Sequence, residues 1–292
     1  MSAQRPAGHP LLVIIDPTAR VVDGESVRIA KDVLCAGSYS VKIALPETAE
    51  EADRAVAHRG RRRIVVIGDD GALLRALRAL HHERALGEAP VGLVPIGPRS
   101  VVSLARSLGV PAEAVPAARA VLDGAERALD LLIDDSGGIV IGALRIPSRS
   151  AGPGAAVADD ADDDDGQHWW TPVERTARSL VRTLTAPIPA LPRLPGREGH
   201  PVRQRLRVEA DGILLTDLDH AVHEVSVRTG LDGLAEVIVR RPDDEGPMCV
   251  RARSVTVSGR DFRYRADAAI SGPVRTRTWT VRPAAWRLTV PR

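Results

Sequence analysis

The turn at residues 68–72 has the residue types of a phosphate-binding site. An apolar run at 63–68 predicts a buried strand, Gly68-Asp69-Asp70-Gly71 ends it, and a helical pattern follows. Unpaired main-chain N–H groups at a helix start attract phosphate, and glycine lets the backbone approach a ligand closely. A turn aspartate, here Asp70, can hold Mg²⁺ directly or through water. The turn therefore indicates phosphate chemistry, and a purely structural turn is the alternative.

Other residues with reactive side chains form no second site. The chain has neither GxGxxG nor GxxxxGK[ST], and Cys35 and Cys249 fit no metal-binding spacing. Two isolated thiols indicate a reducing, cytoplasmic setting. The apolar run at 11–16 is too short for a signal peptide, and no stretch reaches the roughly 18 apolar residues of a membrane span. We therefore expect a cytoplasmic protein whose membrane contact is at most peripheral.

The elements that position this turn alternate between strand and helix patterns. Strand-like runs at 11–16, 40–45, 63–68 and 91–97 are separated by segments with helical spacing. Such alternation is typical of a parallel sheet with helices on both faces. The sequence predicts an α/β nucleotide-binding domain at residues 1–126.

The second half of the chain has a different rhythm. From residue 203 onward, alternating apolar and polar residues with frequent turn signals predict a mainly antiparallel, β-sandwich-like domain. We place this β-rich substrate domain at 127–292. It includes an acidic stretch at 149–168, predicted to be a disordered loop, and an amphipathic helix at 171–186. That helix could lie on a membrane surface or dock by its apolar face on the β-rich domain.

Composition is that of a globular protein with a basic C-terminal segment. Hydrophobic residues make up 44%, charged residues 27%, and the formal net charge is +2. Residues 251–292 hold ten arginines against Asp261 and Asp267, which predicts a basic sheet face suited to anionic lipid headgroups or a nucleotide. No nucleic-acid-binding motif is present, so no nucleic acid partner is expected. No pattern predicts an oligomeric state.

Several segments together resemble the diacylglycerol kinase family, which includes sphingosine kinases and bacterial lipid kinases. IVVIGDDGALLRAL at 64–77 resembles the family's strand, GGDGT turn and helix, and IIDPTAR at 14–20 resembles its first-strand Asn-Pro motif. The segment 91–111 resembles IPLGTGNDFARALGIP, and 262–273 and 277–291 resemble the closing strands. The resemblance runs in order along nearly the whole chain. It implies the family's two-domain fold.

The resemblance also implies roles for particular residues. ATP would be held by the following residues, with Asp70 as the Mg²⁺ ligand: Asp16, Gly68, Asp70, Gly71, Gly97, Arg99 and Ser100. Two residues of the turn depart from the family pattern. Asp69 stands in place of the second glycine, where its charge would oppose a phosphate, and Ala72 replaces the threonine.

The strand implied to carry the general base departs further. Asp267-Ala268-Ala269 stand where the family has Asp-Gly-Glu, whose Glu accepts the proton of the lipid hydroxyl. Ala269 cannot accept a proton, and losing a general base costs on the order of 10²–10⁴-fold in rate. Asp267 is therefore the remaining candidate catalytic residue.

Two functions stay open at this point. The first is an ATP- and Mg²⁺-dependent kinase, weakly active or inactive, that transfers a phosphoryl group to a lipid or other hydroxyl substrate. The second is a catalytically inactive pseudokinase that binds a nucleotide, a lipid or a protein partner. An NAD-kinase relative shares the glycine-aspartate turn, but the C-terminal strands resemble lipid kinases better.

Overall fold

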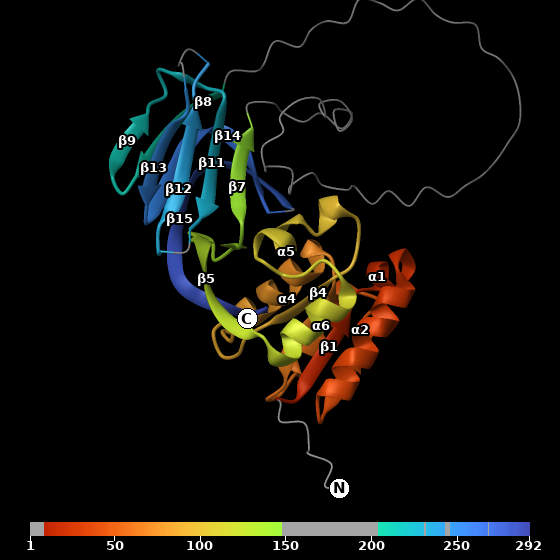
Figure 1. The fold of residues 1–292 in the computed structure, drawn as a ribbon. Helices are drawn as coiled ribbons and strands as arrows, with labels where there is room; N and C mark the ends of the chain where they lie inside the picture. The colour runs from red at the N-terminus through yellow and green to blue at the C-terminus, as the bar shows by residue number, and fades with distance from the viewer. Residues whose placement is uncertain (1–8, 148–203, 231, 243–245, 268) are drawn as a thin grey trace, which may run out of the picture.

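The computed structural model describes residues 9–147, 204–230, 232–242, 246–267 and 269–292. The predicted loop at 149–168 and helix at 171–186 lie outside these ranges. Figure 1 shows two parts, a helix-covered sheet built from the N-terminal half and a strand-rich part built mainly from the C-terminal half. The predicted fold class, an α/β domain followed by a mainly antiparallel one, is confirmed.

The first domain is built on a four-stranded parallel sheet with the order β2-β1-β3-β4. These strands are β1 (Leu11–Ile15), β2 (Val41–Ala44), β3 (Arg63–Gly68) and β4 (Gly92–Pro95). Strand β1 is buried along its whole length, and β3 is buried from its second residue onward. Continuous apolar runs are what a parallel sheet covered on both faces requires.

Helices cover both faces of this sheet. Its helices are α1 (Pro17–Val22), α2 (Gly24–Gly37), α3 (Ala49–Ala57), α4 (Asp70–His82), the 3₁₀ turn η1 (Arg99–Val101), α5 (Ser103–Ser107) and α6 (Ala114–Asp123). Helix α2 packs against α6, and α3 packs against α4. Strand order 2-1-3-4 with right-handed connections places these two helix pairs on opposite faces. The carboxyl ends of β1 and β3 therefore meet the starts of α1 and α4.

The second domain is an antiparallel sheet that folds around its own core. Its strands are β5 (Ala125–Asp134), β6 (Ile139–Val140), β7 (Ala143–Pro147), β8 (Gln204–Ala210), β9 (Ile213–Thr216), β10 (Ala221–Val222), β11 (Glu224–Thr229), β12 (Ala235–Arg240), β13 (Met248–Ala252), β14 (Ser254–Ala266) and β15 (Ala269–Val290). Strand β14 pairs with β8 along its first half and with β7 at its end. Phe262, Tyr264 and Trp279 fill the enclosed core, with the Tyr264 and Trp279 rings edge to face at 5.0 Å.

The last strand joins the two domains. From Trp279 onward β15 pairs with β5, with an irregularity between Arg282 and Trp286, and its end lies in the core of the first domain (Figure 1). There the main-chain N–H of Thr289 donates to the carbonyl of Val91 at 3.0 Å. Trp286 and Leu288 are fully buried in the core of the first domain. The two domains are therefore joined by a strand that belongs to both.

Candidate functional site

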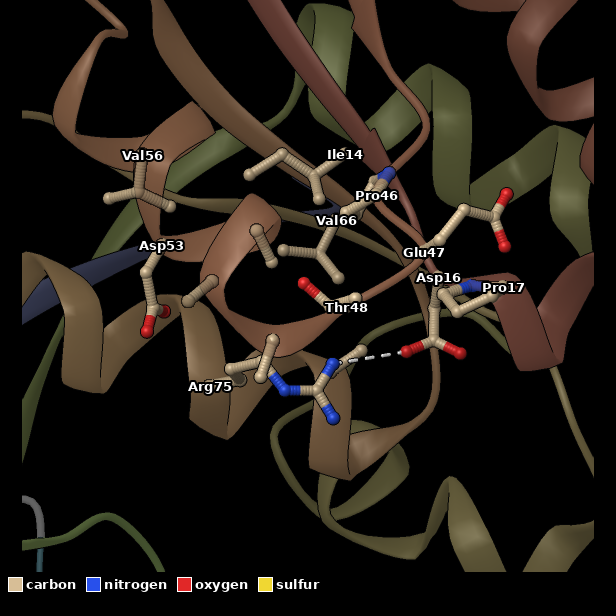
Figure 2. A pocket seen from close by; sticks show the side chains of 14 residues that line it. Ile14, Asp16, Pro17, Pro46, Glu47, Thr48, Asp53, Val56, Val66 and Arg75 are labelled. Carbon is tan, nitrogen blue, oxygen red and sulfur yellow. Dashed lines mark hydrogen bonds and ion pairs between the residues drawn. The ribbon is translucent and has the colours of Figure 1, made fainter.

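A cavity of about 200 Å³ opens at the carboxyl ends of β1 and β3, between α3 and α4. Its apolar walls come from both strands and both helices, and its polar walls come from the starts of α1 and α3 and from α4 (Figure 2). The lining residues are Ile14, Asp16, Pro17, Pro46, Glu47, Thr48, Ala49, Ala52, Asp53, Val56, Val66, Ala72, Arg75 and Ala76. We call this the Asp16–Arg75 cavity. Ligands of open α/β sheets bind outside the carboxyl ends of the strands, so its position is that of a ligand site.

Asp16 connects the first strand to the cavity. Its side chain is buried, and Oδ1 accepts a hydrogen bond from the N–H of Thr18 at 2.7 Å, which caps α1. Oδ2 accepts from Nη1 of Arg75 at 3.3 Å, an ion pair that Figure 2 shows across the cavity wall. Asp16 was among the residues predicted from the sequence, and Arg75 was not. The helical spacing of Arg75 from Gly71, one turn earlier, could have indicated that it faces the same site.

The Gly68–Ala72 turn joins β3 to α4 as the sequence predicted. A Cβ on Gly68 would lie 2.9 Å from the Cβ atoms of both Asp16 and Ala72. Gly68 is therefore required because β1 and α4 approach each other closely at this point. Asp69 is the N-cap of α4, and its Oδ1 accepts from the N–H of Ala72 at 2.9 Å. The Asp69 carboxylate therefore occupies the start of α4, where a phosphate would be expected to bind.

Asp70, predicted as the Mg²⁺ ligand, turns away from the cavity. Its Oδ2 accepts from the N–H of Leu104 at 2.8 Å, and its Oδ1 accepts from the N–H of Ala105 at 2.9 Å. Burial raises the pKa of Asp70 to about 6; the two N–H donors oppose the rise, and the charges of Asp69 and Asp267 add to it. Asp70 thus fixes the start of α5. Within the ranges that the structure describes, no group of three or more His, Cys, Asp or Glu residues is placed to hold a metal. The role of Asp70 as an Mg²⁺ ligand stays a prediction.

Gly97, Arg99 and Ser100 lie on the loop that leads from β4 to α5. Gly97 has a φ of +145°, and a Cβ there would lie 2.7 Å from Cγ2 of Val101, so glycine is required by both conformation and space. Arg99 and Ser100 are exposed and do not line the Asp16–Arg75 cavity. The structure therefore brings Asp16, the Gly68–Ala72 turn and Arg75 together at the cavity, whereas the predicted residues of this loop do not line it.

Asp267 lies at the turn between β14 and β15 with only 3% of its surface exposed. Its Oδ2 accepts from the N–H of Ile141 at 3.0 Å, and its Oδ1 accepts from those of Gly142 and Ala143 at 2.9 and 3.3 Å. Burial raises the pKa of Asp267, while these donors and the positive charge of Arg78 on α4 oppose the rise. Asp267 thus fixes the connection between β6 and β7.

Thr48 is a further cavity residue that the sequence interpretation missed. Its Oγ1 accepts from the N–H of Glu51 at 3.3 Å, and Glu51 Oε2 accepts from the N–H of Glu47 at 2.8 Å. Together these two bonds cap the start of α3, and their signal, Thr followed three residues later by Glu, is present in the sequence. The capping pattern could have located the helix start but not its position on a cavity.

Several arginines of the predicted basic face are paired with carboxylates. Nη1 of Arg277 lies 2.5 Å from Oδ1 of Asp135, and Nη1 of Arg287 lies 2.8 Å from Oε2 of Glu126. Arg251 pairs with Asp232, and Arg253 is exposed. Contact of this face with an anionic membrane stays a prediction. None of the helices in the described ranges is both long and apolar enough to cross a membrane.

The structure thus combines a parallel α/β domain that carries a glycine–aspartate turn with an antiparallel β domain. Residues 10–133 match the family model of the diacylglycerol kinase catalytic domain, which confirms the family resemblance for this segment. The first domain, with its GDDG turn and the Asp16–Arg75 cavity, lies within the matched segment.

Solved structures assigned as diacylglycerol kinases of Bacillus anthracis str. Sterne share the fold over nearly the whole chain. One is 13% identical with a TM-score of 0.64, and covers 97% of this chain and 98% of its own. Two others are 12% identical, with TM-scores of 0.61 and 0.66; each covers 97% of this chain, and 97% and 98% of their own chains. No curated protein matches the chain. At such low identity these structures establish the fold and leave the chemistry to the residues of the site.

Proposed function

We propose that this protein is a non-catalytic relative of the lipid kinases that binds a ligand of the nucleoside or nucleotide class in the Asp16–Arg75 cavity. The observation that carries the proposal is the state of Asp267. Its carboxylate accepts three main-chain N–H bonds in a buried position, and Ala269 stands where the resemblance implies the general base. Of the two functions that the sequence left open, this is the second.

A general base must accept the substrate proton within hydrogen-bond reach. Asp267 has only 3% of its surface exposed, and its oxygens already hold N–H groups of the β6–β7 connection, so burial keeps a substrate hydroxyl away from this carboxylate. Asp70 is held in the same way by the start of α5. Both carboxylates that the resemblance implies for chemistry therefore act as structural acceptors.

The family match implies ATP, and usually a divalent metal, as the kinase cofactors. Bound ATP would supply the phosphoryl group for transfer. The residues at the start of α4 do not fit a metal-bound polyphosphate, since Asp69 caps the helix and Asp70 turns toward α5. The cavity has apolar walls, a threonine hydroxyl and an ion pair between buried Asp16 and partly exposed Arg75, which are features of small-molecule sites.

The proposal is tested by incubating the purified full chain with radiolabelled ATP, Mg²⁺ and mixed-lipid vesicles that contain diacylglycerol. We expect no labelled lipid above the protein-free control, while a nucleoside or nucleotide raises the melting temperature of the protein. Labelled lipid that disappears in a folded Asp267→Asn variant would show that the protein is a kinase and that Asp267 is catalytic.

A further inference from the structure

Three helices begin at the edge of the Asp16–Arg75 cavity, and an oxygen of this chain caps each of them. Asp16 Oδ1 accepts from Thr18 N at 2.7 Å at the start of α1. Thr48 Oγ1 accepts from Glu51 N at 3.3 Å at the start of α3. Asp69 Oδ1 accepts from Ala72 N at 2.9 Å at the start of α4. Phosphate binds at helix starts through unpaired N–H groups and the helix dipole. At each of these three helix starts, a side-chain oxygen of the protein already accepts from one of those N–H groups.

The charges around the cavity also disfavour an anion. Among the 14 lining residues, Asp16, Glu47 and Asp53 are acidic and Arg75 is the basic one, and Arg20, outside the lining, pairs with Glu47 at 2.6 Å. The guanidinium of Arg75 is already paired with Asp16. Asp69 adds a further carboxylate beside the lining residue Ala72. Two like charges 4 Å apart repel by about 1 kcal/mol in water and about 4 kcal/mol near a protein surface.

The size of the cavity limits which part of a ligand can enter. Its volume of about 200 Å³ is below the roughly 300–1,000 Å³ of pockets that enclose drug-sized ligands. The apolar side chains of Ile14, Val56 and Val66 can pack against a ring, and the Asp16 carboxylate can accept from hydroxyl groups. A polyphosphate attached to that ring would lie outside, close to the negatively charged start of α4.

We infer that the Asp16–Arg75 cavity selects an uncharged nucleoside and rejects the corresponding triphosphate, with Asp69 as the residue that sets this preference. The inference rests on the proposed function, because it narrows the ligand class of the same cavity. Asp69 acts by placing a negative charge where the first phosphates of a nucleotide would come to lie. Replacing that charge with a neutral acceptor keeps the cap and removes the repulsion.

The experiment is isothermal titration calorimetry of the full chain with adenosine, AMP and ATP, each without Mg²⁺. We expect the unmodified protein to bind adenosine at least about tenfold more tightly than ATP. Asp69→Asn retains an oxygen that can accept from Ala72 N, so it should raise the affinity for ATP by about tenfold and leave that for adenosine unchanged. Asp69→Gly, which recreates the glycine of the family turn, should have the same direction of effect.

Asp23→Asn is the matched control. Asp23 caps α2, accepts from Ser26 N at 3.0 Å and does not line the cavity. This variant removes the same charge from another helix cap, so the order of affinities should not change. If the unmodified protein binds ATP more tightly than adenosine and Asp69→Asn does not alter the ratio, the inference is wrong while the proposed ligand site stands. If no compound of the series binds either protein, the proposed function fails as well.

Discussion

The Asp16–Arg75 cavity and the Asp267 turn use the same residue type in different ways. In the cavity, one oxygen of Asp16 accepts a main-chain N–H and the other holds Arg75 beside an open space. At the turn, both oxygens of Asp267 are taken up by three main-chain N–H groups. Under the proposed function, the first aspartate contacts a ligand and the second serves only the fold. An aspartate at a motif position can persist because the fold needs it.

The largest expected effect tests whether Asp267 is structural. Asp267→Ala leaves three N–H donors without their acceptor, so it should lower the free energy of unfolding by about 3–5 kcal/mol in chemical denaturation. Asp267→Asn keeps one acceptor and tolerates the φ of +51° at this position, so its loss should be smaller. If the alanine variant is as stable as the unmodified protein, Asp267 is not a structural acceptor and does not differ from Asp16 in this respect.

The pH dependence of stability tests whether Asp70, like Asp267, is a buried structural acceptor. Its pKa is raised to about 6 in the folded protein from an ordinary 3.8, so the folded state binds the extra proton. Stability from this group is present below about pH 4 and is lost as the pH rises toward 6, a loss of about 3 kcal/mol at about 1.4 kcal/mol per pKa unit. Urea unfolding between pH 4 and 7 should show this slope, and Asp70→Asn should flatten it. An identical slope in both proteins would contradict the assignment.

Gly68→Ala tests how closely β1 and α4 must approach to form the cavity. The added methyl group would meet Asp16 and Ala72 at 2.9 Å, so we expect a loss of about 1–3 kcal/mol in stability. Displacing either neighbour should also weaken adenosine binding. Gly24→Ala is the control, because no atom lies within 4 Å of the methyl group it would add. Equal stability of the two variants would show that the close approach does not matter.

The smallest effect on stability is expected for Arg75→Ala. The Arg75 side chain is 37% exposed and its ion pair spans 3.3 Å, so the loss should stay below about 1 kcal/mol. The affinity for adenosine should nevertheless fall by about tenfold, because Arg75 forms a wall of the cavity. Arg28→Ala removes ion pairs on the exposed face of α2 and should leave adenosine binding unchanged. If both variants bind adenosine equally well, the ligand lies elsewhere.

The sequence predicted the first domain well because its signals are local. The runs that form β1 and β3 are apolar throughout, as strands buried on both faces require, and glycine and aspartate mark the turn between β3 and α4. The predicted strand-to-helix turn at Gly68–Ala72 lies where the structure has it. Asp16 was assigned through the family resemblance, and the short helix that follows it was not predicted.

What the sequence could not predict is the direction in which each carboxylate points. Asp70 accepts from residues 34 and 35 positions away, and Asp267 accepts from residues 124 to 126 positions away. Arg75 reaches Asp16 across 59 positions. These partners are brought together by the packing of separate elements, which no pattern within one segment encodes. For this reason the sequence did not show that Asp70 holds the start of α5, and Arg75 was overlooked.

Because β15 ends inside the first domain, that domain depends on the last residues of the chain. The core of the first domain includes three residues from the end of the chain, which follow the whole second domain in the sequence: Trp286, Leu288 and Val290. A fragment that stops near residue 124 would therefore lack the strand that pairs with Val91 next to β4. It would also leave a cavity where the Trp286 side chain packs. Such a fragment should aggregate or melt early. The first domain is therefore expected to fold only as part of the intact chain.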